Sequence, residues 1–134
     1  MLVRIDPSSS VPLAEQVAGS LRRALAEGTL GPGDRLPAAR EVARLLGINM
    51  HTVLKGYQLL REQRLIDLRR GRGGVVIATP GEARVREAAH LLIAAAHEAG
   101  LSEAETVALV RAGWAARVGA SSASASSPDR EGRS

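Results

Sequence analysis

The sequence predicts a mainly α-helical protein with one small β-hairpin, and residues 34–77 carry most of the evidence. Two short amphipathic segments in this region are separated by a tight turn at residues 47–49. A basic, glycine-rich segment follows at residues 69–74, between two strand-like runs. Two helices that meet at a tight turn and precede a basic hairpin are typical of a helix-turn-helix with a wing. We therefore expect a winged helix-turn-helix with a two-helix C-terminal appendage.

The first helix is expected to begin at Pro12, after a polar lead over residues 1–10. Proline suits a first helical turn because its missing N–H has no partner inside the helix there. Gly28 stands where a left-handed residue commonly ends a helix. Between them, apolar residues at helical spacing predict one buried face, formed by Leu13, Val17, Leu21, Ala24 and Leu25.

The second and third helices form the predicted helix-turn-helix. The second is expected over residues 38–46 and is ended by Gly47. The third is expected over residues 50–63, with Asn49 as an N-cap whose side chain accepts from an unpaired backbone N–H. Strands are expected over residues 65–69 and 75–78, joined by a turn at residues 71–74. We expect the third helix to pack through Val53, Leu54, Tyr57, Leu59 and Leu60.

Two further helices are predicted behind the hairpin. Thr79 and Glu82 fit a capping box, and Ser102 and Glu105 fit another after a helix stop at Gly100. From residue 119 onward the apolar periodicity is lost, which predicts a disordered tail. The expected organisation is a winged domain over residues 1–78, a two-helix domain over residues 79–118 and a tail over residues 119–134.

The two C-terminal helices carry more apolar surface than a pair of short helices can bury by itself. We expect a second copy of the chain to cover this surface, so that the protein is a homodimer. The alternative, in which these faces fold back onto the winged domain of the same chain, stays open. The predicted dimer interface consists of Val85, Ala89, Leu92, Ile93 and Ala96 on one helix and Val107, Val110 and Trp114 on the other.

Composition limits the possible classes of protein. A chain of 134 residues allows one small domain and an appendage. The absence of cysteine excludes disulfides, thiolate metal sites and a cysteine nucleophile, and it suits a reducing compartment. The longest apolar run, near residues 91–96, is too short to cross a bilayer. We expect a soluble cytoplasmic protein without a cofactor.

Positive charge is concentrated on the helix-turn-helix and the wing. Residues 35–72 hold nine Lys and Arg against three Asp and Glu, whereas residues 79–134 hold six against seven. A localised basic surface favours a polyanion as the partner. The N-terminal residues of a recognition helix contact base edges, and glycine lets a wing approach a groove closely. The predicted DNA-binding residues are Arg35, Arg40, Asn49, Met50, His51, Thr52, Lys55, Arg69, Arg70, Arg72 and Gly73.

Residues 5–78 resemble the GntR family of bacterial transcription regulators. The matching motifs are Pro-Leu-Ala-Glu-Gln at 12–16, the run at 28–37, the run at 38–49, the segment at 52–60 and the Arg-Gly-Arg-Gly wing. The resemblance implies a winged helix that binds operator DNA as a dimer, with an effector or dimerisation domain behind it. It also implies DNA contacts by Arg35, Arg40 and residues 50–52, and a wing glycine at Gly73.

The short segment behind the wing is similar to the YtrA subfamily, which implies a repressor, often of a transporter operon. Whether a small-molecule effector exists stays open. The chain departs from the family pattern at four places: Ala38 stands where a capping Ser is usual, Met50 where Arg or Pro is common, Arg64 where Gly is usual, and Gly74-Val75 where Thr-Phe is usual. Met50 therefore puts the sequence preference in question.

Other classes of function find less support. Residues 71–74 resemble an RNA-binding arginine–glycine segment, but one copy between two strands favours a hairpin turn. His90 and His97 are seven residues apart on one helix, about 10 Å along its axis, which is too far to bind one metal ion together. No nucleophile–base pair or carboxylate constellation indicates an enzyme. A purely oligomeric structural protein is the remaining alternative.

Overall fold

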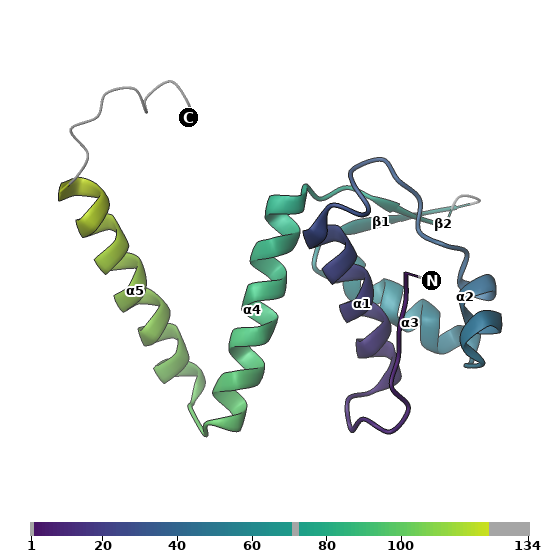
Figure 1. Ribbon diagram of the computed structural model, residues 1–134, viewed down its shortest axis with the longest axis horizontal. Coiled ribbons are helices and arrows are strands. Elements are labelled where there is room, and N and C mark those ends of the chain that lie inside the picture. Colours follow the sequence, from purple (N-terminus) through teal and green to yellow (C-terminus); the bar gives the residue numbers. More distant parts are fainter. Residues whose placement is uncertain (1, 71–72, 124–134) are drawn as a thin grey trace. The chain divides into compact units, whose positions relative to one another are not determined.

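The computed structural model describes residues 2–70 and 73–123, with side chains to residue 120 (Figure 1). Over these residues it contains a mainly helical chain with one antiparallel hairpin, which confirms the predicted fold class. The contacts between residues divide the chain into two compact units, with the boundary after His90. In chain order the elements are α1 (Leu13–Glu27), α2 (Ala39–Leu46), α3 (Met50–Glu62), β1 (Ile66–Arg69), β2 (Gly73–Val76), α4 (Pro80–Glu98) and α5 (Glu103–Ala123).

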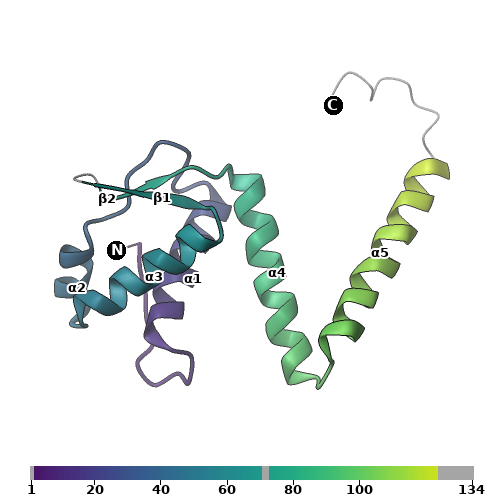
Figure 2. The ribbon, with the colours of Figure 1, turned by 180° about the vertical axis from the view of Figure 1, so that it is seen from behind.

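The core of the first unit lies between α1 and α3, which are side by side in both views (Figures 1 and 2). The predicted face of α1 is buried except for Leu13, which is half-buried. On α3 the prediction for Leu54 is wrong, because this side chain is 37% exposed. Gly56 takes its place on the buried face, where a Cβ would lie 2.9 Å from the carbonyl oxygen of Ala14. The two helix backbones therefore approach closely at Gly56.

The segment before α1 is not only a polar lead. Val3 is 1% exposed and belongs to the core. The hydroxyl of Ser20 on α1 accepts from the backbone N–H of Arg4 at 3.0 Å and donates to the Arg4 carbonyl at 2.8 Å. The N-terminal segment is thus packed along α1, and residues 1–10 contribute to the fold.

The turn between α2 and α3 has the geometry that its sequence predicts. Gly47 adopts a left-handed conformation with φ of 69°, which a residue with a Cβ rarely adopts. The side chain of Asn49 accepts from the backbone N–H of His51 at 2.7 Å and caps α3. Helix α2 begins one residue later than predicted, because Ala38 is its N-cap and supplies no side-chain hydrogen bond.

Residues 33–36 form hydrogen bonds along the second strand of the hairpin. The backbone N–H of Gly33 donates to Val76 at 2.8 Å, and that of Leu36 donates to Gly74 at 2.9 Å. The second strand covers Gly73–Val76 and not 75–78, since the N–H groups of Ile77 and Ala78 both donate to the Leu65 carbonyl outside the ladder. The wing therefore rests directly on the segment that precedes α2.

A tight turn joins α3 to β1, and it places Arg64 at φ of 63°. Within the described residues, Arg64 is the single residue other than glycine with a positive φ. Its N–H donates to the Arg61 carbonyl at 2.9 Å, and the next N–H, that of Leu65, donates to Leu60 at 3.0 Å. The glycine expected here from the family resemblance is the residue that this left-handed conformation favours.

Both predicted capping boxes are present. Glu82 accepts from the N–H of Thr79 at 2.8 Å and Glu105 accepts from that of Ser102 at 2.8 Å, with the reciprocal bonds at 3.1 Å. The first unit includes the start of α4, because Ala83 is fully buried in its core. The contact boundary thus falls inside α4, whereas the sequence predicted a boundary at Thr79. Helix α5 continues to Ala123, past the predicted end at residue 118, and residues 124–134 of the expected tail lie outside the described residues.

Candidate nucleic-acid interface

The outward face of α3 carries the residues predicted to contact bases. His51 and Lys55 are exposed, and Thr52 is half-buried in the first turn. The opposite face, with Val53 and Leu60 fully buried, holds the helix against the core. The first turn of α3 contains no acidic residue, so its free N–H groups and helix dipole favour an approaching phosphate.

Two predicted residues, Asn49 and Met50, are less available than the sequence suggested. The side chain of Asn49 is engaged as the α3 cap. Met50 is half-buried and packs against the core cluster. Both residues stand at the junction of turn and helix, where capping and packing compete with any contact to a ligand. His51, Thr52 and Lys55 are therefore the better-placed side chains of this helix.

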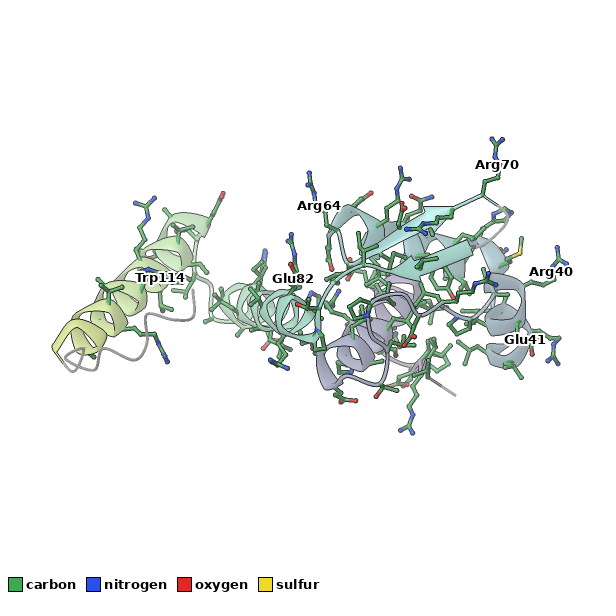
Figure 3. The ribbon with its side chains drawn as sticks, turned by 90° about the horizontal axis from the view of Figure 1, so that it is seen from above. Arg40, Glu41, Arg64, Arg70, Glu82 and Trp114 are labelled. Atoms are coloured by element: carbon green, nitrogen blue, oxygen red, sulfur yellow. The ribbon has the colours of Figure 1, made fainter. Side chains whose placement is uncertain are left out.

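Arg35 and Arg40 flank the start of α2. Arg35 is exposed and forms an isolated β-bridge with Val75 of the wing. Arg40 is exposed in the first turn of α2. Figure 3 shows Arg40 and Arg70 extending away from the ribbon at the same end of the first unit. The wing and α2 thus present cations at the same end of this unit.

The wing carries one paired and one unpaired arginine among its described residues. Arg69 Nε lies 3.2 Å from Asp67 Oδ2 in an exposed ion pair. Arg70 is exposed and forms no ion pair in the described part of the chain. Gly73 has φ of 69°, so its backbone conformation suits glycine. Arg72, the third predicted wing arginine, lies outside the described residues.

Tyr57 packs on the core as predicted, but the sequence did not indicate its hydrogen bond, nor the ion pair of Arg22. Tyr57 is 3% exposed and its hydroxyl donates to the Pro37 carbonyl, which connects α3 to the segment before α2. Arg22 on α1 is 2% exposed and forms an ion pair with Glu87 of α4 at 2.8 Å. The burial of Arg22 was predictable from the sequence, because Arg22 lies four residues after Ala18 and therefore on the buried face of α1.

Most of the predicted dimer interface is exposed in the single chain. The exposed fraction is 71% for Trp114 and 68% for Val85. Four more of these residues are exposed: Ala89, Ile93, Val107 and Val110. Leu92 is half-buried. Ala96 differs, since it is 5% exposed and its carbonyl accepts from the N–H of Leu101 at the turn into α5. Ala96 therefore has little surface left for a partner.

The described residues contain no group of three or more His, Asp or Glu side chains placed to bind a metal ion. None of the described helices is both long and apolar enough to span a bilayer. His90 and His97 are exposed on α4.

Comparison with known proteins shows the family to which the chain belongs. Residues 13–76 match the model of the bacterial regulatory proteins of the gntR family. The HTH-type transcriptional repressor YtrA of Bacillus subtilis is 39% identical over 72 residues, which cover 54% of this chain and 55% of that protein. The chain thus spans about half the length of that repressor.

Two further relatives are covered more fully. The HTH-type transcriptional regulator Rv1152 of Mycobacterium tuberculosis is 30% identical over 107 residues, with 78% of this chain and 88% of that protein covered. The structure of YtrA from Sulfolobus acidocaldarius, a GntR-family transcription factor, shares 34% identity with a TM-score of 0.55, over 70% of this chain and 99% of that one. The chain belongs to the GntR family of DNA-binding transcriptional regulators.

Proposed function

We propose that this chain is a cytoplasmic repressor that binds a palindromic operator as a homodimer. One observation carries the operator contact: Arg35, Arg40, Lys55 and Arg70 are exposed, and none of them forms an ion pair among the described residues. Cations without acidic partners are free to neutralise phosphates, and phosphate contacts supply most of the affinity for DNA.

In the proposed complex, α3 enters the major groove and the wing lies over the neighbouring groove. His51 and Thr52 contact base edges, where their side chains donate and accept hydrogen bonds. The DNA phosphates are contacted by Arg35, Arg40 and Lys55. The wing residues Arg69, Arg70, Arg72 and Gly73 also contact the DNA. Asn49 and Met50 shape the start of the helix and contribute less to base contact.

The homodimer is supported by the apolar faces of the second unit. A cavity of about 580 Å³ lies at the turn between α4 and α5, lined by Ile93, Leu101 and Val107 among others. Trp114, Val107 and Val110 recur on one face of α5 and are all exposed, and a contiguous exposed apolar surface indicates an interaction site. A second copy that covers these residues places two recognition helices on one DNA, which accounts for a palindromic operator.

Repression, and a transporter operon as the target, are proposed from likeness. The Bacillus subtilis relative is a repressor by name, and the resemblance to the YtrA subfamily favours a transporter operon. The test is selection of bound sequences from random double-stranded DNA. If the dimer neutralises roughly 6–10 phosphates, the log–log slope of affinity against salt is about −5 to −9. A flat salt response, or equal affinity for single-stranded RNA, contradicts the proposal.

Two variants separate anchoring from base recognition. Arg40→Ala is expected to weaken binding to every sequence and to reduce the salt slope by about one unit. His51→Ala is expected to relax the preference at one base position by about 1–3 kcal/mol. Arg23→Ala, which removes an exposed arginine of α1 outside the proposed interface, is the matched control and should bind like the parent. If all three variants bind alike, the assigned face of α3 is wrong.

A further inference from the structure

Arg22, which is buried, and Glu87, which is half-buried, form an ion pair that joins α1 to α4. Arg22 Nε donates to Glu87 Oε1 at 2.8 Å, and the two side chains are 3% and 15% exposed. Arg22 Nη1 also donates to Gln63 Oε1 at 3.3 Å, and Gln63 is the C-cap residue of α3. All three residues belong to the first unit. One guanidinium therefore connects the end of the recognition helix to the first half of α4.

The start of α4 contacts the rest of the first unit through few side chains. Ala83 is fully buried, whereas the residues on the other faces of this half of the helix are exposed: Arg84, Val85, Arg86, Ala88, Ala89 and His90. Glu87 lies one turn after Ala83 on the same face. A contact through the small side chain of Ala83 does not by itself fix the direction of the α4 axis, because the helix could pivot about that contact. The second contact, at Glu87, fixes the line of the helix axis.

The ion pair is better suited to fix a direction than to add stability. The cost of removing two charges from water offsets most of their attraction. A hydrogen-bonded guanidinium and carboxylate, however, accept only a narrow range of distances and angles. Helix α4 is continuous from Pro80 to Glu98, so the ion pair lies on the same helix that runs on from the first unit into the second.

We propose that Arg22 and Glu87 determine the spacing between operator half-sites that the homodimer accepts. The inference rests on the homodimeric operator binding proposed above. A dimer selects one spacing only when the connection between each DNA-binding unit and the dimer contact is stiff, because a flexible connection lets two sites be engaged over many distances. Neither residue touches DNA in this role. They are positioning residues, and Gln63 supports Arg22.

The experiment measures binding to operators that have identical half-sites and different spacer lengths. The parent is expected to prefer one spacer about tenfold over spacers changed by two base pairs. Glu87→Gln keeps the shape of the side chain and removes its charge, and we expect it to reduce this preference to about threefold or less. Affinity for DNA with a single half-site should not change. Arg84→Gln, at an exposed position on the same helix, is the matched control and should keep the parent profile.

A second variant covers the case in which Glu87→Gln does not fold because Arg22 is buried without its partner. Arg22→Met combined with Glu87→Leu removes both charges and keeps apolar volume, which buried ion pairs commonly tolerate. It should fold, form dimers and lose the spacing preference. An unchanged spacing profile in either folded, dimeric variant overturns the inference, as does a parent that binds all spacers equally. A parent without affinity for double-stranded DNA overturns the proposed function instead.

Discussion

The hydroxyl of Tyr57 on α3 donates to the backbone carbonyl of Pro37, two residues before α2 begins. Tyr57 is 3% exposed and Pro37 is half-buried, so this hydrogen bond is partly shielded from water. Pro37 follows the segment that contains Arg35, and that segment is hydrogen-bonded to β2 of the wing. A single side chain of α3 therefore connects this helix to the segment that lies between α2 and the wing.

Tyr57→Phe is expected to lower the free energy of unfolding by about 1 kcal/mol, because it leaves the Pro37 carbonyl without its partner. Urea denaturation at neutral pH measures this loss. The fold should survive, since the aromatic ring still fills its place in the core. A variant with the stability of the parent would show that water replaces the hydroxyl at no cost.

The same residue predicts an alkaline loss of stability. Burial raises the pKa of Tyr57 to about 12 from its ordinary value of 10.0. The unfolded chain ionises first, so rising pH favours unfolding, and the stabilisation by neutral Tyr57 is lost between about pH 10 and pH 12. Urea midpoints across this window should fall less steeply for Tyr57→Phe than for the parent. Parallel curves would contradict the assignment.

Ala38→Ser is expected to stabilise the protein by about 0.5–1 kcal/mol. Ala38 is the N-cap of α2 with ψ of 135°, and the cap position has no side-chain hydrogen bond. A serine hydroxyl there can accept from an unpaired N–H of the first turn. Thermal denaturation checks the gain, and Ala38→Val, which offers no acceptor, is the control. Equal melting temperatures for the serine and valine variants would contradict the cap.

Arg64→Gly is expected to stabilise the protein by about 0.5–1 kcal/mol. A left-handed residue with a Cβ costs about 1–2 kcal/mol, and the greater freedom of glycine in the unfolded chain returns part of this gain. Arg64→Ala separates the backbone effect from the loss of charge, because alanine keeps the Cβ and removes the guanidinium. Chemical denaturation should rank the variants glycine first, with alanine near the parent. The reverse order would mean that the charge of Arg64 matters more than its backbone.

Gly56→Ala is expected to destabilise the protein by about 1–3 kcal/mol, although alanine normally favours a helix over glycine. The new Cβ would lie 2.9 Å from both the Ala14 carbonyl oxygen and Val17 Cγ1, so α1 and α3 must move apart. Gly19→Ala on α1 is the control, because its Cβ meets only the ends of arginine side chains, 3.5 Å away or more. Denaturation midpoints should fall for the first variant and hold or rise for the second.

Local signals in the sequence predicted much of this fold. The caps at Asn49, Thr79 and Ser102 and the left-handed turn at Gly47 depend on residues at most three positions apart. Their chemistry is therefore visible in a short window of sequence. The same locality explains why Asn49 was predicted both as a cap and as a DNA contact, since its neighbours alone do not decide between the two.

Contacts between distant segments could not be predicted. The bond between Arg22 and Glu87 spans 65 residues, and Val3 reaches the core through a segment held by Ser20, 16 residues after Arg4. Hydrophobic spacing also assigned Leu54 to the core. Gly56, where α1 and α3 approach closely, gives no apolar signal in the sequence. Positions that matter through the absence of a side chain are invisible to a search for apolar periodicity.

Leu92→Glu is expected to weaken self-association at least a hundredfold, because an unpaired charge buried in an interface costs several kcal/mol. Leu92 is half-buried and lies within the apolar face of α4, whereas Ala94 lies on the opposite side of the helix by its spacing and is exposed. Ala94→Glu therefore introduces the same charge as a matched control and should leave the proposed dimer intact. Sedimentation velocity at micromolar concentration measures both.

Trp114 reports on the same contact, because it is the single tryptophan of the chain and is 71% exposed in one copy. If the parent forms the proposed dimer, its fluorescence should lie at shorter wavelength than that of Leu92→Glu. The far-ultraviolet circular dichroism should stay close to that of the parent, since the winged unit does not depend on Leu92. Operator affinity should fall steeply, because two half-sites are no longer engaged together. A parent that is monomeric at micromolar concentration, or a Leu92→Glu dimer as tight as the parent, would show that another surface covers these helices.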